Sequence, residues 1–405
     1  AGAAVGYCNV AQAAAAIVQA FRPADAKRAL GNTALAQRSF GFDDYVAVIV
    51  AQLTTAAALR ADAARATGEI LDSGLFDFAF HDNAPHNDGR STRAAVRAYV
   101  ARGQKGLVRY NPRPGFNEGV ARSRMSQPGP ALMTPHSAAT HRCVVLPDTP
   151  VRMTGPALRA AVHLHLHYPE LAEEFVALLA SARQRPGVRS APAPLDIVVT
   201  TTSDRRRLEI EYAFRAYTPG TVRVLVGPNR GRDIGPFLTD AGRLLRDGGY
   251  DVVGHLHGKR SLAVDAAMGD RWRSYLMGTL LGGAAGLSGI FDLFARDPLL
   301  GLVFAEDRHC VGWGKNKPFA AGLAGRLQPP AAVPDWPIFP IGTMFWARPA
   351  AVLPLWSSGF VSQDFPAEPL PYDGTVLHAI ERMLPSVCEA TGHGWCTVYR
   401  KGAGW

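Results

Sequence analysis

Two histidines and a lysine alternate at the end of an apolar run in YDVVGHLHGKRS, residues 250–261. Successive side chains of a β-strand point to opposite faces, so His255, His257 and Lys259 would project from one face of a strand. The imidazoles could bind a transition metal, and the three groups together could neutralise a diphosphate. Histidines on a strand are also commonly bonded only to backbone and water, so the pattern alone leaves these interpretations open.

A second polar segment, GPNRGRDIGPFL, covers residues 227–238. Gly231 and Gly235 permit tight backbone geometry before a helix, whose free N–H groups together with Arg232 suit a phosphate or a sugar. The spacing is neither that of a dinucleotide-binding loop nor that of a P-loop, which argues against both. Asp233 could equally be a helix cap in a structural turn.

A third segment, LPYDGTVLHAIERMLP, places Asp373 before a helix that carries His378, Glu381 and Arg382. Residues three and four apart are neighbours on a helix surface, so these side chains could orient one another. Asp373 could act as a general base on a hydroxyl group, and its simpler role is that of a helix N-cap.

Two further stretches, GWGKNKPFA and FPIGTMFWARP, combine glycine with aromatic and basic residues. Trp313, Lys315 and Asn316 would lie in a glycine-rich loop that either closes over an anionic donor or forms an exposed turn. Trp346 lies on an expected strand, where it could form the floor of a sugar site, although a Phe-Trp pair is more often part of a core.

Strand and helix patterns alternate between residues 158 and 257, which predicts βαβ units, an α/β fold and a mostly parallel sheet flanked by helices. Ligands bind such sheets at the carboxyl ends of the strands. The polar residues His167, Asp204, Asn229 and Asp233 follow the expected strands, so we predict that they line a site there together with the 255–259 segment.

Composition changes along the chain suggest four parts. Residues 1–60 are alanine-rich and helical, and they could be the tail of another domain. Residues 61–118 are expected to form a small helical module, residues 119–152 a linker rich in proline and glycine, and residues 153–405 the α/β domain.

The overall composition restricts the function classes. The 405 residues carry a formal charge of +9, which suits phosphorylated substrates or an anionic membrane surface, but no basic run interleaved with aromatics indicates nucleic-acid binding. Neither a membrane span nor a secretory signal is recognisable. Five scattered cysteines indicate a reducing compartment, and Cys388, His393 and Cys396 are better explained by structural thiols than by a zinc site.

Several of these stretches together resemble the rhamnan synthesis protein F family of bacterial polysaccharide biosynthesis. The matching segments, in order along residues 158–400, are HLHLHYPELAEE, NRGRDIGPFL, YDVVGHLHGKRS, GWGKNK, FPIGTMFWARP and DFPAEPLPYDGTVLHAIERMLP. The resemblance implies a GT-A-like glycosyltransferase that uses a nucleotide-sugar donor and extends a polysaccharide or a lipid-linked glycan. Residues 72–118 are similar, more loosely, to a helical module that accompanies such domains.

The resemblance also suggests roles for individual residues. Where GT-A enzymes carry a metal-binding Asp-x-Asp pair, this chain reads His255-Leu256-His257. A magnesium or manganese cofactor is therefore in doubt, with Asp233 as the one nearby carboxylate, because these ions prefer oxygen ligands. We expect Lys259, both histidines and Arg232 to replace the metal at the diphosphate.

By the same resemblance, Asp373 matches the catalytic base of inverting enzymes, and the donated sugar could be rhamnose or another deoxysugar. The expected location is the cytoplasm, with peripheral association at the inner face of the plasma membrane. The alternative is a non-catalytic glycan-binding or scaffolding subunit, because the altered metal motif is what a decayed transferase would show.

Overall fold

A computed structural model describes residues 42–82, 91–104, 108–124, 139–151, 155–181, 195–258 and 266–403. The first part of the predicted N-terminal helical segment, residues 1–41, and Lys259 lie outside these ranges.

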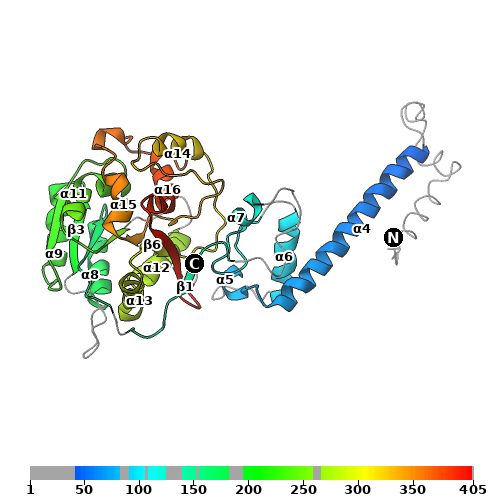
Figure 1. The fold of residues 1–405 in the computed structure, drawn as a ribbon, viewed down its shortest axis with the longest axis horizontal. Helices are drawn as coiled ribbons and strands as arrows, with labels where there is room; N and C mark the ends of the chain where they lie inside the picture. Colours follow the sequence, from blue (N-terminus) through cyan, green and yellow to red (C-terminus); the bar gives the residue numbers. More distant parts are fainter. Residues whose placement is uncertain are drawn as a thin grey trace.

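An eight-stranded sheet forms the centre of the larger part of the molecule (Figure 1). The strand order is β1-β8-β6-β7-β5-β2-β3-β4, and every pair is parallel except the two that β7 makes with β5 and β6. The strands are β1 (Cys143–Val145), β2 (Ala160–His165), β3 (Leu195–Thr201), β4 (Val222–Val226), β5 (Val252–His257), β6 (Leu300–Ala305), β7 (Phe345–Ala347) and β8 (Gly394–Tyr399). The prediction of a mostly parallel α/β sheet is confirmed.

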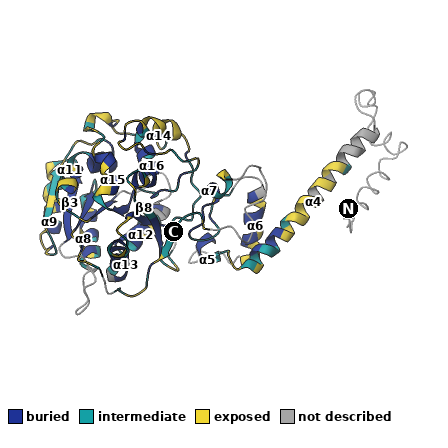
Figure 2. Ribbon diagram, in the orientation of Figure 1, coloured by how far each residue is buried: buried dark blue, intermediate teal, exposed yellow. Residues whose placement is uncertain are grey.

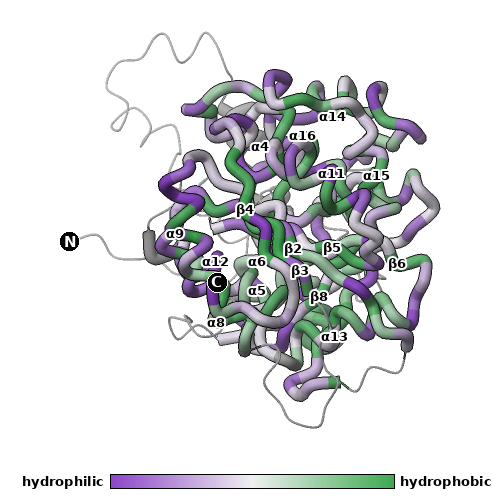
Figure 3. The backbone as a smooth tube through the Cα atoms, turned by 90° about the vertical axis from the view of Figure 1, so that its left-hand side faces the viewer, coloured by the Kyte–Doolittle hydropathy of each residue, from purple (hydrophilic) through white to green (hydrophobic). Residues whose placement is uncertain are grey.

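Helices cover both faces of the sheet, and each face has its own hydrophobic cluster. One cluster joins the sheet to α8 (Ala172–Ser181), α9 (Asp204–Phe214), α12 (Ala266–Leu280) and α13 (Gly283–Arg296). The other joins it to α10 (Ile234–Leu238), α11 (Asp240–Asp247), α14 (Lys317–Ala324), α15 (Pro349–Trp356) and α16 (Val376–Ala390). Because β2, β3 and β5 are covered on both sides, they are uniformly buried. Hydrophobic segments gather in this part of the molecule (Figure 3). Two short 3₁₀ turns, Pro169–Leu171 and Ser362–Asp364, complete this part.

A smaller helical part precedes the sheet. It consists of α4 (Phe42–Ser73), α5 (Phe78–Asp82), α6 (Thr92–Gln104) and α7 (Glu118–Ser123). The end of α4 packs on α6 around Ile70, Val96 and Tyr99, while the rest of α4 projects away from the molecule (Figure 1). Most of the described side chains between residues 50 and 65 are exposed (Figure 2). A backbone hydrogen bond between two segments attaches this part to the sheet domain: Asn111 N–H donates to the Arg308 carbonyl at 2.6 Å.

Several elements differ from the sequence-based expectation. Helix α4 crosses the boundary that we placed at residue 60, and β1 lies in the sheet although we assigned it to a linker. The strands β1 and β8 and the helix α15 were not expected. The glycine-rich loop is shorter than expected, since α14 begins within it at Lys317.

Among the described residues, no single helix has both the length and the apolar composition of a membrane span. One bent pair, 269–280 with 285–296, meets that criterion only when its two helices are combined.

Candidate functional site

The carboxyl ends of β2, β3, β4 and β5 meet at one edge of the sheet, because these strands are mutually parallel. The register pairs His163 with His255 and His165 with His257 across β2 and β5. Their alternation along each strand therefore places four imidazoles on one face, next to the end of β3.

A chain of hydrogen bonds connects these imidazoles. His165 Nδ1 lies 2.9 Å from Thr200 Oγ1, which lies 2.8 Å from His163 Nε2. His163 Nδ1 lies 2.9 Å from His255 Nδ1, and the two rings stack with centroids 5.0 Å apart. The chain ends at Asp233 Oδ2, which is 3.4 Å from His255 Nε2.

The donors and acceptors of this chain fit only one direction when the imidazoles are neutral and Asp233 is ionised. A carboxylate only accepts, so His255 donates from Nε2 and must accept at Nδ1 from His163. His163 then accepts at Nε2 from the Thr200 hydroxyl, whose oxygen accepts from His165. These tautomers follow from the network. The chain thus connects Asp233 at the sheet edge to buried groups of β2, β3 and β5.

Burial favours the neutral form of His163 and His165. It lowers the pKa of His165 to about 3, and burial reinforced by the neighbouring His255 lowers the pKa of His163 well below its ordinary value. Both ring nitrogens of His255 are already bonded within the protein, to His163 and to Asp233. These contacts leave neither nitrogen of His255 available for the expected diphosphate contact.

The free energy of unfolding is expected to fall as the pH falls from about 7 to about 5. Because His163 and His165 have lowered pKa values when folded, the unfolded chain binds more protons in this interval, and acid favours it. Below its unfolded pKa, each of these histidines lowers the free energy of unfolding by about 1.4 kcal/mol for each unit by which the pH falls. Urea denaturation across this interval, where ordinary carboxylates stay ionised, measures the slope, and a flat profile would contradict neutral burial.

The loop between β4 and α10 brings Arg232 to the segment that leads to Asp373. Arg232 Nη2 donates to the carbonyls of Leu370 and Pro371, each at 3.4 Å. Arg230 donates to the Phe365 carbonyl at 2.8 Å and strengthens the same contact. Two segments that are far apart in sequence therefore form one wall of the site.

The backbone of this loop confirms the expected need for glycine. Gly231 has φ +74°, and a Cβ there would lie 2.7 Å from Gly235 Cα. Arg232 itself has φ +51°, and Thr343 has φ +57°. They are the two non-glycine residues with positive φ among the described residues, and both lie at this candidate site. Backbone strain of this kind is often found at functional sites.

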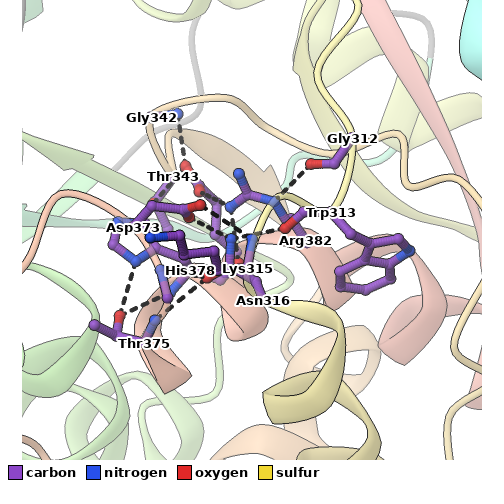
Figure 4. A network of polar contacts seen from close by, with 12 residues as sticks. Gly312, Trp313, Lys315, Asn316, Gly342, Thr343, Asp373, Thr375, His378 and Arg382 are labelled. Atoms are coloured by element: carbon purple, nitrogen blue, oxygen red, sulfur yellow. Dashed lines mark hydrogen bonds and ion pairs between the residues drawn. The ribbon is translucent and has the colours of Figure 1, made fainter.

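Asp373 is bound to the loop that precedes α14 (Figure 4). Its Oδ1 accepts from the side-chain amide of Asn316, and its Oδ2 accepts from Lys315 N–H at 3.1 Å. Asn316 is fully buried, and its own oxygen accepts from the N–H groups of Gly374 at 3.0 Å and Thr375 at 3.3 Å. Asn316 therefore fixes the position of the carboxylate, and it is buried although we expected it in a loop that closes over a donor or in an exposed turn.

The helix-cap interpretation of Asp373 is also wrong. Thr375 caps α16 by accepting from His378 N–H, and its hydroxyl lies 2.8 Å from His378 Nδ1. Gly374, at φ +83°, turns the chain between Asp373 and this cap. Gly314 allows the close approach on the other side, because a Cβ there would lie 2.6 Å from Asp373 Oδ2.

The carboxylate of Asp373 is stabilised in its ionised form. Partial burial alone would raise its pKa, but hydrogen bonds from Asn316, Lys315 N–H and Gly374 N–H outweigh burial and lower the pKa below its ordinary value. Asp373 is thus ionised at neutral pH and can accept a proton.

Gly342 connects the Asp373 side of the site to the histidine side. Its carbonyl accepts from His257 Nε2 at 2.6 Å, and its N–H donates to Glu381 Oε1 at 2.8 Å. Glu381 Oε2 accepts from Arg382, whose Nε donates to the Gly312 carbonyl at 3.1 Å. Arg382 also donates to the His378 carbonyl at 3.0 Å, so Glu381 and Arg382 are held by contacts within the protein.

The remaining predicted residues lie in two kinds of environment. His167, Asn229 and Asp204 lie at the sheet edge and are partly or fully exposed; the Asp204 side chain is 78% exposed and pairs with Arg207. Trp346 is completely buried and donates to the Leu280 carbonyl, so it cannot form the floor of an open sugar site. Trp313 is also buried. Trp346 therefore belongs to the core, and Trp313 is buried although we expected it in a loop that closes over a donor or in an exposed turn.

Both cysteines of the C-terminal segment are buried thiols. Cys388 and Cys396 are buried in hydrophobic clusters on opposite faces of the sheet. Burial raises the pKa of their thiols to about 12 and about 11. Over the described residues there is no group of three histidines, cysteines or carboxylates that could hold a metal ion.

Sequence reasoning missed Thr200, Gly314, Gly342 and Thr343. The glycines carried a signal, since each stands in a short segment that already contained a candidate side chain. Thr200 follows three buried apolar residues in β3 and gave no signal, because only its neighbour β2 supplies the histidines that it bonds.

The fold and the polar residues at the sheet edge define an α/β protein with a mostly parallel sheet and a candidate site at the carboxyl ends of its strands. The model of the rhamnan synthesis protein F family matches residues 141–392, and the chain belongs to that family.

Two curated relatives are each called uncharacterized protein WxcX, from Xanthomonas campestris pv. campestris strains B100 and ATCC 33913. Both are 32% identical over 259 residues, which cover 62% of this chain and 34% of each relative. The chain thus matches about a third of their length. Among solved structures, the mannosyltransferase PcManGT from Pyrobaculum calidifontis in complex with GDP-Man and Mn²⁺ aligns with 11% identity and a TM-score of 0.33, over 63% of this chain and 59% of that one. A score this low carries no argument about fold or function.

Proposed function

We propose that this chain is a glycosyltransferase that transfers a sugar from a nucleotide-sugar donor to a growing bacterial surface polysaccharide. Rhamnose or another deoxysugar is the proposed sugar, in keeping with the family. The observation that supports the proposal is the contact of Arg232 with Leu370 and Pro371, which brings the loop that we propose for the diphosphate to the segment of Asp373. A cationic group for a diphosphate and an ionised carboxylate for a hydroxyl would then share one site. The acceptor would be a polysaccharide or a lipid-linked glycan, reached by peripheral association with the membrane.

The positive charge at the diphosphate would come from Lys259 and Arg232. In GT-A-like enzymes a divalent ion supplies this charge, but the residues here do not suit magnesium or manganese. Asp233 Oδ2 lies 3.4 Å from His255 Nε2 and 4.0 Å from His257 Nε2, so it offers one carboxylate beside two imidazoles where these ions prefer oxygen. Electrostatic stabilisation of the leaving group by basic side chains replaces the metal in this proposal.

In the proposed reaction Asp373 takes the proton of an acceptor hydroxyl. The hydroxyl oxygen bonds to the anomeric carbon, while the bond from that carbon to the diphosphate oxygen breaks. The nucleoside diphosphate leaves with the electron pair, and the anomeric configuration is inverted. Asp373 is held ready for this step by Asn316 and Lys315 N–H.

A non-catalytic glycan-binding or scaffolding subunit is the second candidate. It is favoured by the hydrogen bonds on both oxygens of Asp373, because a lowered pKa makes a carboxylate a weaker base. Nucleotide binding separates the two candidates, since a scaffold needs no donor site.

Calorimetric titration of nucleotide sugars and nucleoside diphosphates, with EDTA and with manganese, tests the donor site. Binding is expected to survive EDTA and to weaken about tenfold or more in Lys259→Ala and Arg232→Ala, since each removes a charge-assisted contact. Arg205→Ala is the matched control, because Arg205 is 90% exposed on α9. If no nucleotide binds under either condition, the transferase proposal fails and the scaffold becomes the better explanation.

A further inference from the structure

The loop at residues 311–316, which holds Asp373, is also tied to the helical part of the molecule. Directly before this loop, residues 308–310 pair antiparallel with residues 109–111 through two backbone hydrogen bonds of 2.6 and 2.8 Å. At its other end, the loop binds the Asp373 carboxylate (Figure 4). The proposed base is therefore connected through one short loop to a part that lies outside the sheet domain.

Trp336 adds a second connection, because its indole ring lies between α7 and this loop. A Cβ on Gly119, in α7, would lie 1.9 Å from Trp336 Cε2, and a Cβ on Gly312 would lie 2.8 Å from Trp336 Cη2. Only glycine at these two positions permits so close an approach of the ring. The indole N–H is buried and finds no hydrogen-bond partner among the described residues, so the contact depends on packing of the ring.

Buried hydrogen bonds hold α7 against the rest of the helical part. The Tyr99 hydroxyl, on α6, donates to Glu118 at 2.6 Å, and Arg122 donates to the Gly103 carbonyl at 2.8 Å. Glu118 is fully buried. A shift of α7 would leave polar groups without partners in the interior, which is costly, so α7 is a firm support for Trp336.

The other neighbour of the ring, Gly312, leads directly to the groups that orient Asp373. Gly312 precedes Trp313, whose carbonyl accepts from the Asn316 side chain at 2.9 Å. Asn316 in turn donates to the Asp373 carboxylate. A displacement of Trp336 would therefore reach the carboxylate through this loop.

We propose that Trp336 is a positioning residue for Asp373, through which the helical part keeps the 311–316 loop in the geometry that proton transfer needs. This inference rests on the proposed function and extends it, because it gives a catalytic purpose to a part that contains none of the residues assigned to the donor or the base. A misplacement of about 1 Å at a reacting group can cost about a hundredfold in rate, so a small shift of the loop is sufficient.

Gly119→Ala tests the inference, since the added methyl group would collide with the rigid indole ring. The kcat of sugar transfer is expected to fall about tenfold or more, while the KM for the donor and nucleotide binding stay unchanged. Gly322→Ala is the matched control, because it makes the same change on α14, where an added Cβ meets no atom within 4 Å. The control should transfer sugar as the unmodified chain does.

Hydrogen exchange gives a second measurement that needs no substrate. The N–H groups of Lys315 and Gly374 belong to the Asp373 network, and they should exchange faster in Gly119→Ala than in the control. Faster exchange without any transfer by the unmodified chain would support the coupling and refute only the proposed function. Unchanged exchange with unchanged kcat would overturn the inference. Nucleotide binding that falls as far as kcat would also overturn it, since a general defect would then explain both.

A second variant protects the test against a folding defect. Trp336→Leu removes the ring atoms next to both glycines and breaks no hydrogen bond of the indole. It should also lower kcat, because the loop loses its packing partner, while thermal unfolding stays cooperative. In the double variant, Gly119→Ala should add little to this loss, since the ring that its methyl group would meet is absent. Additive losses would show that the two residues act separately, and they would overturn the inference.

Discussion

Replacing Asp373 with asparagine is expected to reduce sugar transfer by about 10²–10⁴-fold, the usual contribution of a positioned general base. The asparagine keeps the size of the side chain but cannot take a proton from the acceptor. Donor binding should change little, because Arg232 contacts backbone carbonyls of this segment and does not contact Asp373 itself. Transfer is measured by release of nucleoside diphosphate in the presence of acceptor.

The control for this variant is Asp335→Asn, which alters an exposed carboxylate paired with Lys317. The asparagine at 373 faces two donors, Asn316 Nδ2 and Lys315 N–H, and loses one hydrogen bond. Thermal unfolding and donor titration must therefore show that the variant is folded. Near-normal transfer by a folded variant would remove Asp373 from the mechanism and favour the scaffolding alternative.

Replacing Asn316 with alanine is expected to cause the largest loss of stability at the site. The buried amide donates to Asp373 and to the Trp313 carbonyl, and it accepts from Gly374 and Thr375 N–H. Each buried group left without a partner costs on the order of 1–3 kcal/mol. Urea denaturation measures the effect, and Asn229→Ala, at an exposed loop position, should change the free energy of unfolding by only about 0.5 kcal/mol or less.

The same variant tests the pKa of Asp373. The hydrogen bond from Asn316 lowers that pKa, so the ionised carboxylate stabilises the fold at pH values above its unfolded pKa, and this contribution is lost as the pH falls through the folded pKa. Without Asn316 the pKa rises toward its ordinary value. The acid limb of the activity profile is therefore expected to move to higher pH, and an unmoved limb would show that Asn316 does not act on the carboxylate.

Mainly apolar runs, which alternating histidines interrupt in β2 and β5, were sufficient to predict β2, β3 and β5, because strands covered on both faces bury nearly every residue. The edge strand β1 and the strand β8 were not predictable in this way. They are short or partly exposed, and their pairing partners are distant in sequence. Nor did any local pattern show that β7 enters the sheet antiparallel between β5 and β6.

The sequence was sufficient to predict which segments form the candidate site, but not which contacts the individual side chains make there. Asp373, Arg232 and Asp233 were chosen for their position after expected strands or before an expected helix. His255 was chosen as a cation, yet its nitrogens bond to His163 and Asp233. Whether an imidazole carries charge depends on its burial, which the sequence alone does not give.

The sequence by itself determined the α/β class, the family and the edge of the sheet at which chemistry-bearing residues gather. These features depend on local patterns, namely apolar strands, the polar residues that end them, and glycines at turns that only glycine tolerates well. Tertiary structure alone decided which partner each polar group meets. Asn316 binds Asp373 across 57 residues, and Thr200 joins histidines of a neighbouring strand. Hydrogen bonds and desolvation act over a few ångströms in space, so they are set by packing between segments and not by their order in the chain.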